Sequence, residues 1–441
     1  MLPPGPKGHL LVGSLPEFRR DILGFFARCA REYGDVVPLR VPRRKLVLLS
    51  HPDLIEEVLT ARARHTTKTV LVQSLRPVLG DGLLLSEGEH WLRQRRLIQP
   101  AFHRQRIAAY GDVMAGYADR AMATWKDGEA RDVHADMMAV TQAIVAKTLF
   151  DADVSDATWD VGHALHVLME DFSRRRTRLI ELPAWVPTPA RRRARAAIER
   201  LDRIVYGIIA ARRASGEDRG DLLSMLLHAR DADDGSRMTD RQVRDEIMTL
   251  FLAGHETTAV SLSWTWYLLA QHPAVEARLV DELRGVLGGR LPTVADLPRL
   301  RYTEMVVTES MRLHPPVYSL TRRVAEPCEV GGHAIAPETV LVMSQWVVHR
   351  DPRWYDAPAT FQPDRWEDDL AKRLPRYAYF PFGGGPRLCI GNTFALMEAT
   401  LLLATIAQRF SFGLAPGAAV KPMLSVTLRP AGGLPMILSA R

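Results

Sequence analysis

Apolar and polar positions alternate at helical spacing through the middle of the chain, from about residue 90 to 290. The longest such segment begins near Thr239 or Asp240, both favourable helix N-caps, and ends at Gln271, ahead of Pro273. A helix of this length, about 30 residues, is roughly 45 Å long. Its middle, from Ile247 to Leu269, is largely apolar, so we expect this helix to cross the core.

Short β-like runs lie towards both ends of the chain. Val36–Val41 and Leu46–Ser50 predict two strands joined by a turn, and Cys328–Ile335 predicts a hairpin around two glycines. A last helix is expected from about Asn392 to Phe410. Together these patterns predict a mainly α fold with small β-sheets.

Composition excludes several classes of protein. The 441 residues are 47% hydrophobic and 25% charged, which is typical of a globular chain and not of a disordered or fibrous one. The net charge of +7 has no nucleic-acid motif behind it, so we expect no nucleic-acid partner and regard an acidic protein partner as compatible. No apolar run is long enough to predict a transmembrane anchor, and the first residues do not predict a signal peptide.

The three cysteines, Cys29, Cys328 and Cys389, are odd in number and far apart. We therefore expect no disulfide framework, and we expect a cytoplasmic location. No cysteine or histidine cluster has zinc spacing, so at most one cysteine has special chemistry.

Cys389 lies in the glycine-rich segment Phe382–Gly391, two residues after Arg387 and just before a predicted helix. Glycines let a backbone approach something flat or bulky, and a helix N-terminus favours a thiolate. A thiolate is a strong electron-donating axial ligand for iron. For a cysteine considered alone, a buried unreactive thiol is the simpler interpretation.

Polar residues interrupt the apolar middle of the long helix at Ala253–Thr258. Ala253 and Thr257 share a face at i, i+4, and Gly254 leaves room beside them. The neighbouring acid, Glu256, and the Thr257 hydroxyl could pass protons to a group bound there. The alternative is a threonine that only donates back to a helix carbonyl.

Two further pairs have weak signals of their own. Glu309 and Arg312 stand at i, i+3 on a helix, and with the later Arg365 they could form a buried ionic lock that specifies geometry. Trp91 and Arg95 share a helix face, and their side chains are hydrogen-bond donors that suit a carboxylate. A surface ion pair and an amphipathic surface helix are the alternatives.

In this combination the chain resembles the cytochrome P450 family over roughly residues 3–430. The haem-binding pattern Phe-x-x-Gly-x-Arg-x-Cys-x-Gly is met in full by Phe382, Gly385, Arg387, Cys389 and Gly391.

The family's other patterns occur in the expected order. The oxygen-activating pattern is met by Ala253, Gly254, Glu256 and Thr257; the remaining motifs are met by Glu309 and Arg312, by Arg365, and by Trp91 and Arg95. The segment Pro363-Asp364-Arg365-Trp366 departs mildly, with Asp for the usual Glu and Trp for Phe.

The resemblance implies one P450 domain over residues 1–441, with haem b between the long helix and the helix after the cysteine loop. It implies that Cys389 is the iron ligand, that Thr257 donates to dioxygen, and that Glu256 helps deliver protons. The remaining cofactor-binding candidates are Trp91, Arg95, Ala253, Gly254, Arg322, Phe382, Gly385, Arg387 and Gly391. Trp91, Arg95, Arg322 and Arg387 would meet the haem propionates, and Arg323 could replace Arg322 with a one-residue shift. Glu309, Arg312 and Arg365 are structural candidates.

The resemblance also implies a monooxygenase that inserts one atom of O2 by hydroxylation or epoxidation. Electrons would come from NAD(P)H through a separate ferredoxin and ferredoxin reductase, and the chain is expected to be a monomer. Candidate docking residues are Arg93, Arg96, Lys372, Arg373 and Arg376.

We expect a lipophilic substrate, because the family's pocket positions are largely aliphatic here. Those positions are 69–85, 165–179, 250–254, 317–320 and 424–426. The motif style is similar to bacterial members that resemble microsomal P450s, which favours a terpenoid over a fatty acid or polyketide. The loop 182–187 is an apolar candidate for membrane contact. The rival classes are a haem-thiolate peroxygenase, a non-catalytic haem binder and a cysteine hydrolase.

Overall fold

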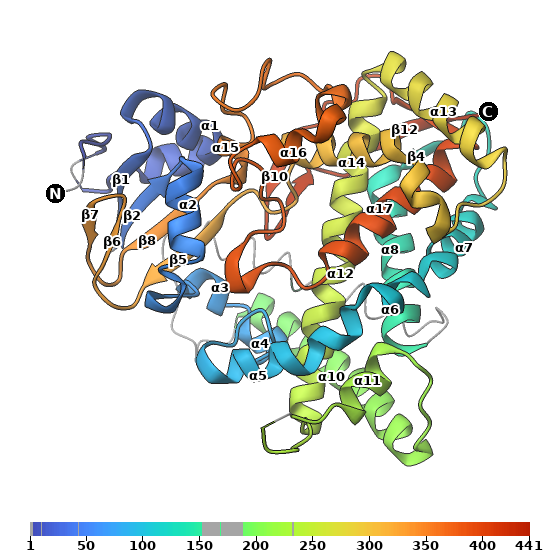
Figure 1. Cartoon of the computed structure of the whole chain (residues 1–441), viewed down its shortest axis with the longest axis horizontal. Coiled ribbons are helices and arrows are strands. Elements are labelled where there is room, and N and C mark those ends of the chain that lie inside the picture. Colours follow the sequence, from blue (N-terminus) through green and yellow to red (C-terminus); the bar gives the residue numbers. More distant parts are fainter. Residues whose placement is uncertain (1–2, 10, 43, 152–167, 169–187, 232) are drawn as a thin grey trace. The chain divides into compact units, whose positions relative to one another are not determined.

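The computed structural model describes residues 3–9, 11–42, 44–151, 168, 188–231 and 233–441 (Figure 1). The chain forms two compact units, residues 1–73 with 308–389 and residues 74–307 with 390–441. The expected pocket segment 165–179, apart from Leu168, and the loop 182–187 lie outside the described residues. The single P450 domain expected over 1–441 stays a prediction.

The first unit is built on a five-stranded sheet in the order β1-β2-β8-β5-β3. Its strands are β1 (Val36–Val41), β2 (Arg44–Leu49), β8 (Val340–Met343), β5 (Leu320–Val324) and β3 (Thr66–Thr67). Strand β2 pairs antiparallel with β1 and parallel with β8. The two strands expected from the sequence are therefore confirmed, with β2 beginning at Arg44 because its register with β1 extends to the turn.

Side chains of the sheet alternate between two apolar clusters, as a strand requires. Leu48 packs with Phe25 and Phe26 of α1 (Leu15–Tyr33), whereas its neighbours Val47 and Leu49 pack with α2 (Pro52–Leu59). The sheet is thus covered on both faces. The glycine-rich loop of the same unit contacts the end of α2.

The remaining elements of this unit are short. They are α3 (Val70–Gln73), α15 (Gln345–Val348), α16 (Leu370–Arg373), η1 (Ala63–His65), η4 (Pro363–Asp369), η5 (Gly385–Arg387) and the hairpin β6 (Cys328–Val330) with β7 (His333–Ile335). The hairpin confirms the expectation for 328–335, with Gly331 and Gly332 both at positive φ in its turn.

The second unit is organised around α12 (Asp240–Leu269), which packs against α8 (Val133–Phe150) and α17 (Asn392–Ala407) (Figure 1). Thr239 caps α12 in a capping box with Gln242, so the predicted start is confirmed. The helix ends two residues before Gln271. Its apolar middle is buried as expected, with Trp264 and Trp266 fully enclosed.

Further helices and two small sheets complete the second unit. The helices are α4 (Arg76–Leu79), α5 (Gly88–Ile98), η2 (Gln99–Phe102), α6 (Arg104–Ala108), α7 (Gly111–Met122), α10 (Pro189–Ser215), α11 (Leu222–His228), α13 (Pro273–Leu287), η3 (Val294–Arg299) and α14 (Arg301–Leu313), which continues into the first unit. The strands are β4 (Ala130–Asp132), β9 (Phe410–Leu414), β10 (Pro422–Leu424), β11 (Leu428–Pro430) and β12 (Pro435–Ala440).

The mainly α fold with small sheets is thus confirmed. The last helix, α17, stops at Ala407 and not at Phe410, because Phe410 begins β9 and pairs with Ala440. Over the part of the chain that the structure describes, no helix is both long and apolar enough to cross a membrane.

Candidate functional site

The cysteine loop is held by its own backbone. The Cys389 N–H donates to the Phe382 carbonyl at 3.0 Å, and the Leu388 N–H donates to the Gly385 carbonyl at 3.1 Å. These bonds close the loop into a compact turn, and Cys389 itself is exposed. The loop therefore presents a thiol from a fixed backbone, three residues before α17 begins at Asn392.

The loop glycines are required by the protein's own packing. Gly385 has φ 63°, and a Cβ there would lie 1.8 Å from the Leu59 carbonyl oxygen at the end of α2. A Cβ on Gly384 would lie 2.2 Å from the ring of Tyr377, whose hydroxyl accepts from the Gly385 N–H at 3.1 Å. These contacts explain two glycines without any ligand. The expected approach of a flat ligand to the loop stays a prediction.

The segment Ala253–Thr257 contains the accessible positions in the middle of α12. From Val243 to Trp266 the helix is buried except at Ala253, which is exposed, and at Gly254 and Thr257, which are half-buried. Small residues thus open a gap in a helix that is otherwise enclosed. The Thr257 hydroxyl donates to the Ala253 carbonyl at 2.9 Å, which is the back-bonded arrangement considered as the alternative.

Glu256 lies next to this gap but is buried and ion-paired. Its Oε1 accepts from Thr427 Oγ1 at 2.5 Å and from Arg429 Nη2 at 2.6 Å. Burial, assisted by the Arg429 charge, lowers the pKa of nearby His134 to about 4. The sequence interpretation missed Thr427 and Arg429, which belong to no recognised motif and lie over 170 residues from Glu256.

The carboxylate-binding candidates fall in both units. Trp91 and Arg95 are half-buried in α5, and Arg387 is half-buried in η5. In β5, Arg322 is 9% exposed, while Arg323 donates to Glu338 at 2.8 Å and to Thr67 at 3.2 Å. Neighbouring strand residues point to opposite faces, so only one of these arginines can serve. Arg323 is already ion-paired with Glu338, so Arg322 is the better candidate for binding a haem carboxylate.

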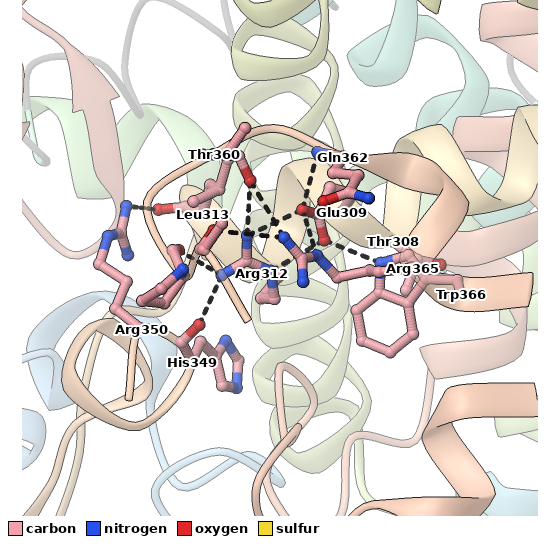
Figure 2. Close-up of polar contacts among 12 residues, drawn as sticks. Thr308, Glu309, Arg312, Leu313, His349, Arg350, Thr360, Gln362, Arg365 and Trp366 are labelled. Carbon is pink, nitrogen blue, oxygen red and sulfur yellow. Dashed lines mark hydrogen bonds and ion pairs between the residues drawn. The ribbon is translucent and has the colours of Figure 1, made fainter. Parts of the chain in front are cut away.

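Glu309, Arg312 and Arg365 come together in the first unit, as Figure 2 shows. Both oxygens of Glu309 accept from Arg312 at 2.8 Å, and Arg365 Nε donates to Oε1 at 2.8 Å. The Trp366 indole N–H adds a bond to Oε2 at 2.9 Å, and the Gln362 N–H adds one to Oε1 at 3.0 Å. One fully buried carboxylate therefore takes five donors.

The fully buried Arg312 also ties distant loops together. Its Nη1 donates to the carbonyls of His349 and Pro358, each at 2.7 Å, and its Nη2 donates to the Thr360 carbonyl at 3.0 Å. These loops precede the cysteine loop in the sequence and belong to the same unit. The lock therefore fixes backbone geometry, as a buried ion pair with complete hydrogen bonding can.

The surroundings of the lock are cationic. Burial, with the neighbouring Arg312 charge, lowers the pKa of Arg350 to about 9. Arg350 donates to the Leu313 carbonyl and stacks on the Trp346 ring. Sequence reasoning placed Arg350 in a structural turn without linking it to the lock, and saw Trp366 only as a departure from the family pattern. A tryptophan was the available signal, because its indole N–H needs a buried acceptor.

A buried acid in α17 was also missed. Glu398 is fully buried, and burial raises its pKa to about 8, partly offset by the Thr258 hydroxyl. Neither carboxylate oxygen has a partner at ordinary hydrogen-bond distance among the described residues. The available sequence signal was a single acidic residue, Glu398, in the otherwise largely apolar helix α17.

The residues present fit a haem with a thiolate ligand. The loop presents an exposed cysteine, α12 has an accessible gap of small residues, and guanidinium groups suit the two haem carboxylates. Cys389, Arg322 and Arg387 belong to the first unit, whereas Trp91, Arg95 and the gap in α12 belong to the second unit.

Comparisons with known proteins point in one direction. The family model described as Cytochrome P450 matches residues 3–434. Cyclooctatin synthase of Streptomyces melanosporofaciens is 40% identical and Pentalenene oxygenase of Streptomyces avermitilis is 34% identical; the matches cover 99% of this chain and 95% and 97% of those proteins.

Cyclooctat-9-en-7-ol 5-monooxygenase, also of Streptomyces melanosporofaciens, is 38% identical over 99% of this chain and 95% of its own. Among solved structures, the cytochrome P450DA heme domain matches with a TM-score of 0.90 at 28% identity, covering 100% of this chain and 98% of that one.

Proposed function

This chain belongs to the cytochrome P450 family and is a haem-dependent monooxygenase, and we propose that it oxygenates a terpenoid through haem held by Cys389. The observation that carries the haem assignment is the exposed Cys389 on a hydrogen-bonded loop. When bound, the haem inserts one atom of O2 into a C–H or C=C bond, while the other atom leaves as water after two electrons and two protons are taken up.

The chain's own residues bind, orient and move protons. Cys389 would hold the haem iron as a thiolate, and as an electron-donating ligand it would favour O–O cleavage. Arg322, Arg387, Trp91 and Arg95 bind the haem carboxylates through charge-assisted hydrogen bonds. Phe382, Gly385 and Gly391 shape the loop against the haem.

The gap at Ala253 and Gly254 admits dioxygen, and the Thr257 hydroxyl supplies a proton there. In the structure that proton is donated to the Ala253 carbonyl, so the hydroxyl must rotate to serve. Glu256 is a carboxylate in its pair with Arg429, so it would take up a proton from solvent once that bond loosens and then pass it to the Thr257 hydroxyl. Two bonds must therefore open before a proton moves from Glu256 to dioxygen: the Thr257–Ala253 hydrogen bond and the Glu256–Arg429 ion pair.

Thr257→Ala is expected to retain haem and substrate binding while product formed per electron falls by roughly tenfold or more, because a positioned proton donor contributes about 10²–10⁴-fold. The electrons would appear as hydrogen peroxide. Thr257→Ser should restore coupling. Thr265→Ala, which removes the same kind of back-bond from a buried position of α12, is the matched control and should stay coupled. Unchanged coupling in Thr257→Ala would refute the role.

For the substrate, the support comes from two sources. The names of two relatives specify oxygenation of pentalenene and of cyclooctat-9-en-7-ol, a terpenoid hydrocarbon and a terpenoid alcohol. The described segments 250–254 and 317–320, expected to line the pocket, are mostly apolar. A polycyclic hydrocarbon skeleton needs this kind of surface and few polar contacts.

Titration of the oxidised holoprotein tests this choice. A polycyclic terpene or terpene alcohol should give a low-spin to high-spin shift of the haem spectrum that saturates. A long-chain fatty acid and a macrolide are the comparison ligands. A saturating shift with only the fatty acid or the macrolide would replace the terpenoid proposal.

For electrons, we propose a separate ferredoxin with its NAD(P)H-dependent reductase, a monomeric chain forming one domain, and a cytoplasmic location. Of the docking candidates, Arg93 pairs with Asp231, Arg96 with Asp233, Lys372 with Asp369 and Arg376 with Glu56. Because these charges are already partly neutralised, they support docking of an acidic partner less strongly than the sequence suggests.

A further inference from the structure

Glu246 of α12 joins three segments of the second unit. The side chain is fully buried. Its Oε1 accepts from Gln94 Nε2 of α5 at 2.9 Å, and its Oε2 accepts from the backbone N–H of Leu83 at 2.9 Å. Gln94 is also fully buried. One carboxyl group therefore connects the central helix to α5 and to the segment before it.

The segment before α5 lies directly on α12. The Asp81 N–H donates to Asp245 at 2.9 Å. A Cβ on Gly80, which has φ 59°, would lie 2.0 Å from an Asp245 oxygen, and a Cβ on Gly82 would lie 2.3 Å from Thr249 Oγ1. Two adjacent acids of α12 thus bind alternate backbone N–H groups of this segment. The position of the segment leaves no room for side chains at its glycines.

Gln94 lies between the two donors of α5. It is three residues after Trp91 and one before Arg95, and each helical residue turns by about 100°. Fixing the buried Gln94 to Glu246 therefore fixes the rotation of α5 about its axis. Trp91 and Arg95 are half-buried on the accessible side of the same helix.

We propose that Glu246 is a positioning residue for α5, holding Trp91 and Arg95 at the height and rotation at which they bind the haem carboxylates. This inference rests on the proposed role of Trp91 and Arg95. Glu246 acts on α5 through Gln94 and through the segment at Leu83.

The protonation state of Glu246 adds a pH dependence. Burial raises its pKa to about 8, with the Leu83 N–H and Gln94 amide opposing the shift and the charges of Asp245 and Asp81 adding to it. Of the neighbouring cations, Arg244 is paired with Asp245 and Asp202, and Arg93 donates to Gln94 Oε1 at 3.4 Å. Near pH 7 the carboxyl group keeps its proton while its oxygens accept from the Leu83 N–H and the Gln94 amide. Because the buried carboxyl group binds its proton more tightly than it would in solvent, the contact loses stability as pH rises from about 4.5 to about 8, and the loss is complete above pH 8.

The rate of haem transfer from the holoprotein to excess apomyoglobin tests the proposal. Glu246→Leu and Gln94→Leu should each release haem about tenfold faster, the equivalent of one buried donor left unpaired. Glu246→Gln matches the protonated acid and should release haem no faster than wild type at pH 7. It should also lack the wild-type increase in haem release between about pH 6 and pH 8.

Glu282→Leu is the matched control, because Glu282 accepts the N–H groups of Tyr302 and Thr303 in the same unit without contacting α5. It should not change haem release. The inference would be overturned if Glu246→Leu released haem at the wild-type rate while Arg95→Ala released it faster. That result would leave the proposed role of Arg95 intact.

Amide hydrogen exchange separates the two claims. In Glu246→Leu, exchange should increase at Leu83 and along α5 but not at Tyr302 and Thr303. If this occurs while Arg95→Ala releases haem at the wild-type rate, the contact stands and the proposed carboxylate role of α5 is wrong. Unchanged exchange at Leu83 and α5 would overturn the positioning role directly.

Discussion

Glu309→Ala is expected to lose about 3–5 kcal/mol of unfolding free energy, the cost of removing one partner from a buried ion pair. Arg312 is fully buried, and the Arg365 side chain is 6% exposed, so both would be left as buried cations without a counter-charge. Arg350 stands beside them, and its pKa is already lowered to about 9. The Trp366 and Gln362 donors would also lose their acceptor.

Equilibrium unfolding of the haem-loaded protein in urea, followed by circular dichroism, measures this effect. Glu309→Gln keeps the size and an acceptor oxygen, so it should fall between wild type and the alanine variant. Glu199→Ala removes an exposed i, i+4 pair with Arg195 and should cost at most about 0.5 kcal/mol. A Glu309→Ala loss as small as that of Glu199→Ala would show that the lock does not stabilise the fold.

Cys389→Ser is expected to abolish product formation, by roughly 1,000-fold or more, as when a group essential to catalysis is removed. A serine hydroxyl stays protonated and is a poor electron donor, so the iron would lose the ligand that favours O–O cleavage. Haem bound per chain should also fall, although the carboxylate contacts remain.

Cys328→Ser is the control for this substitution. Cys328 is half-buried in β6, and burial raises the pKa of its thiol, which makes it an unreactive position. Haem content and product rate should match wild type. Product formation by Cys389→Ser within tenfold of wild type would exclude Cys389 as the axial ligand.

Periodic and local features of this fold were readable from the sequence. The start of α12 follows from the Thr239 cap, and its burial follows from the apolar run. The β6–β7 hairpin follows from two glycines in its turn. Each depends on neighbours within a few residues, for which the physical rules are strongest.

Contacts between distant segments were readable only where a motif names both partners. Glu309 and Arg365 are 56 residues apart, and the family resemblance linked them. The partner of Glu256, Arg429, belongs to no motif, and neither does the Glu246–Gln94 pair. A single acidic letter in an apolar helix signals that a partner exists, but not which one, because tertiary packing chooses it.

Local geometry also altered two interpretations. Gly384 and Gly385 are required by Tyr377 and the Leu59 carbonyl, which a repeat of glycines in a sequence does not reveal. The Thr257 back-bond and a catalytic role for its hydroxyl were stated as alternatives. The structure contains the back-bond, and a rotating hydroxyl makes the two compatible.

The absorption spectrum of the purified protein, reduced and exposed to carbon monoxide, tests the central claim most directly. Thiolate ligation by Cys389 predicts the strongly red-shifted Soret band that distinguishes haem-thiolate proteins from those with a histidine ligand, and predicts its loss in Cys389→Ser. A histidine-type band in the wild-type protein, or no haem band at all, would contradict the account.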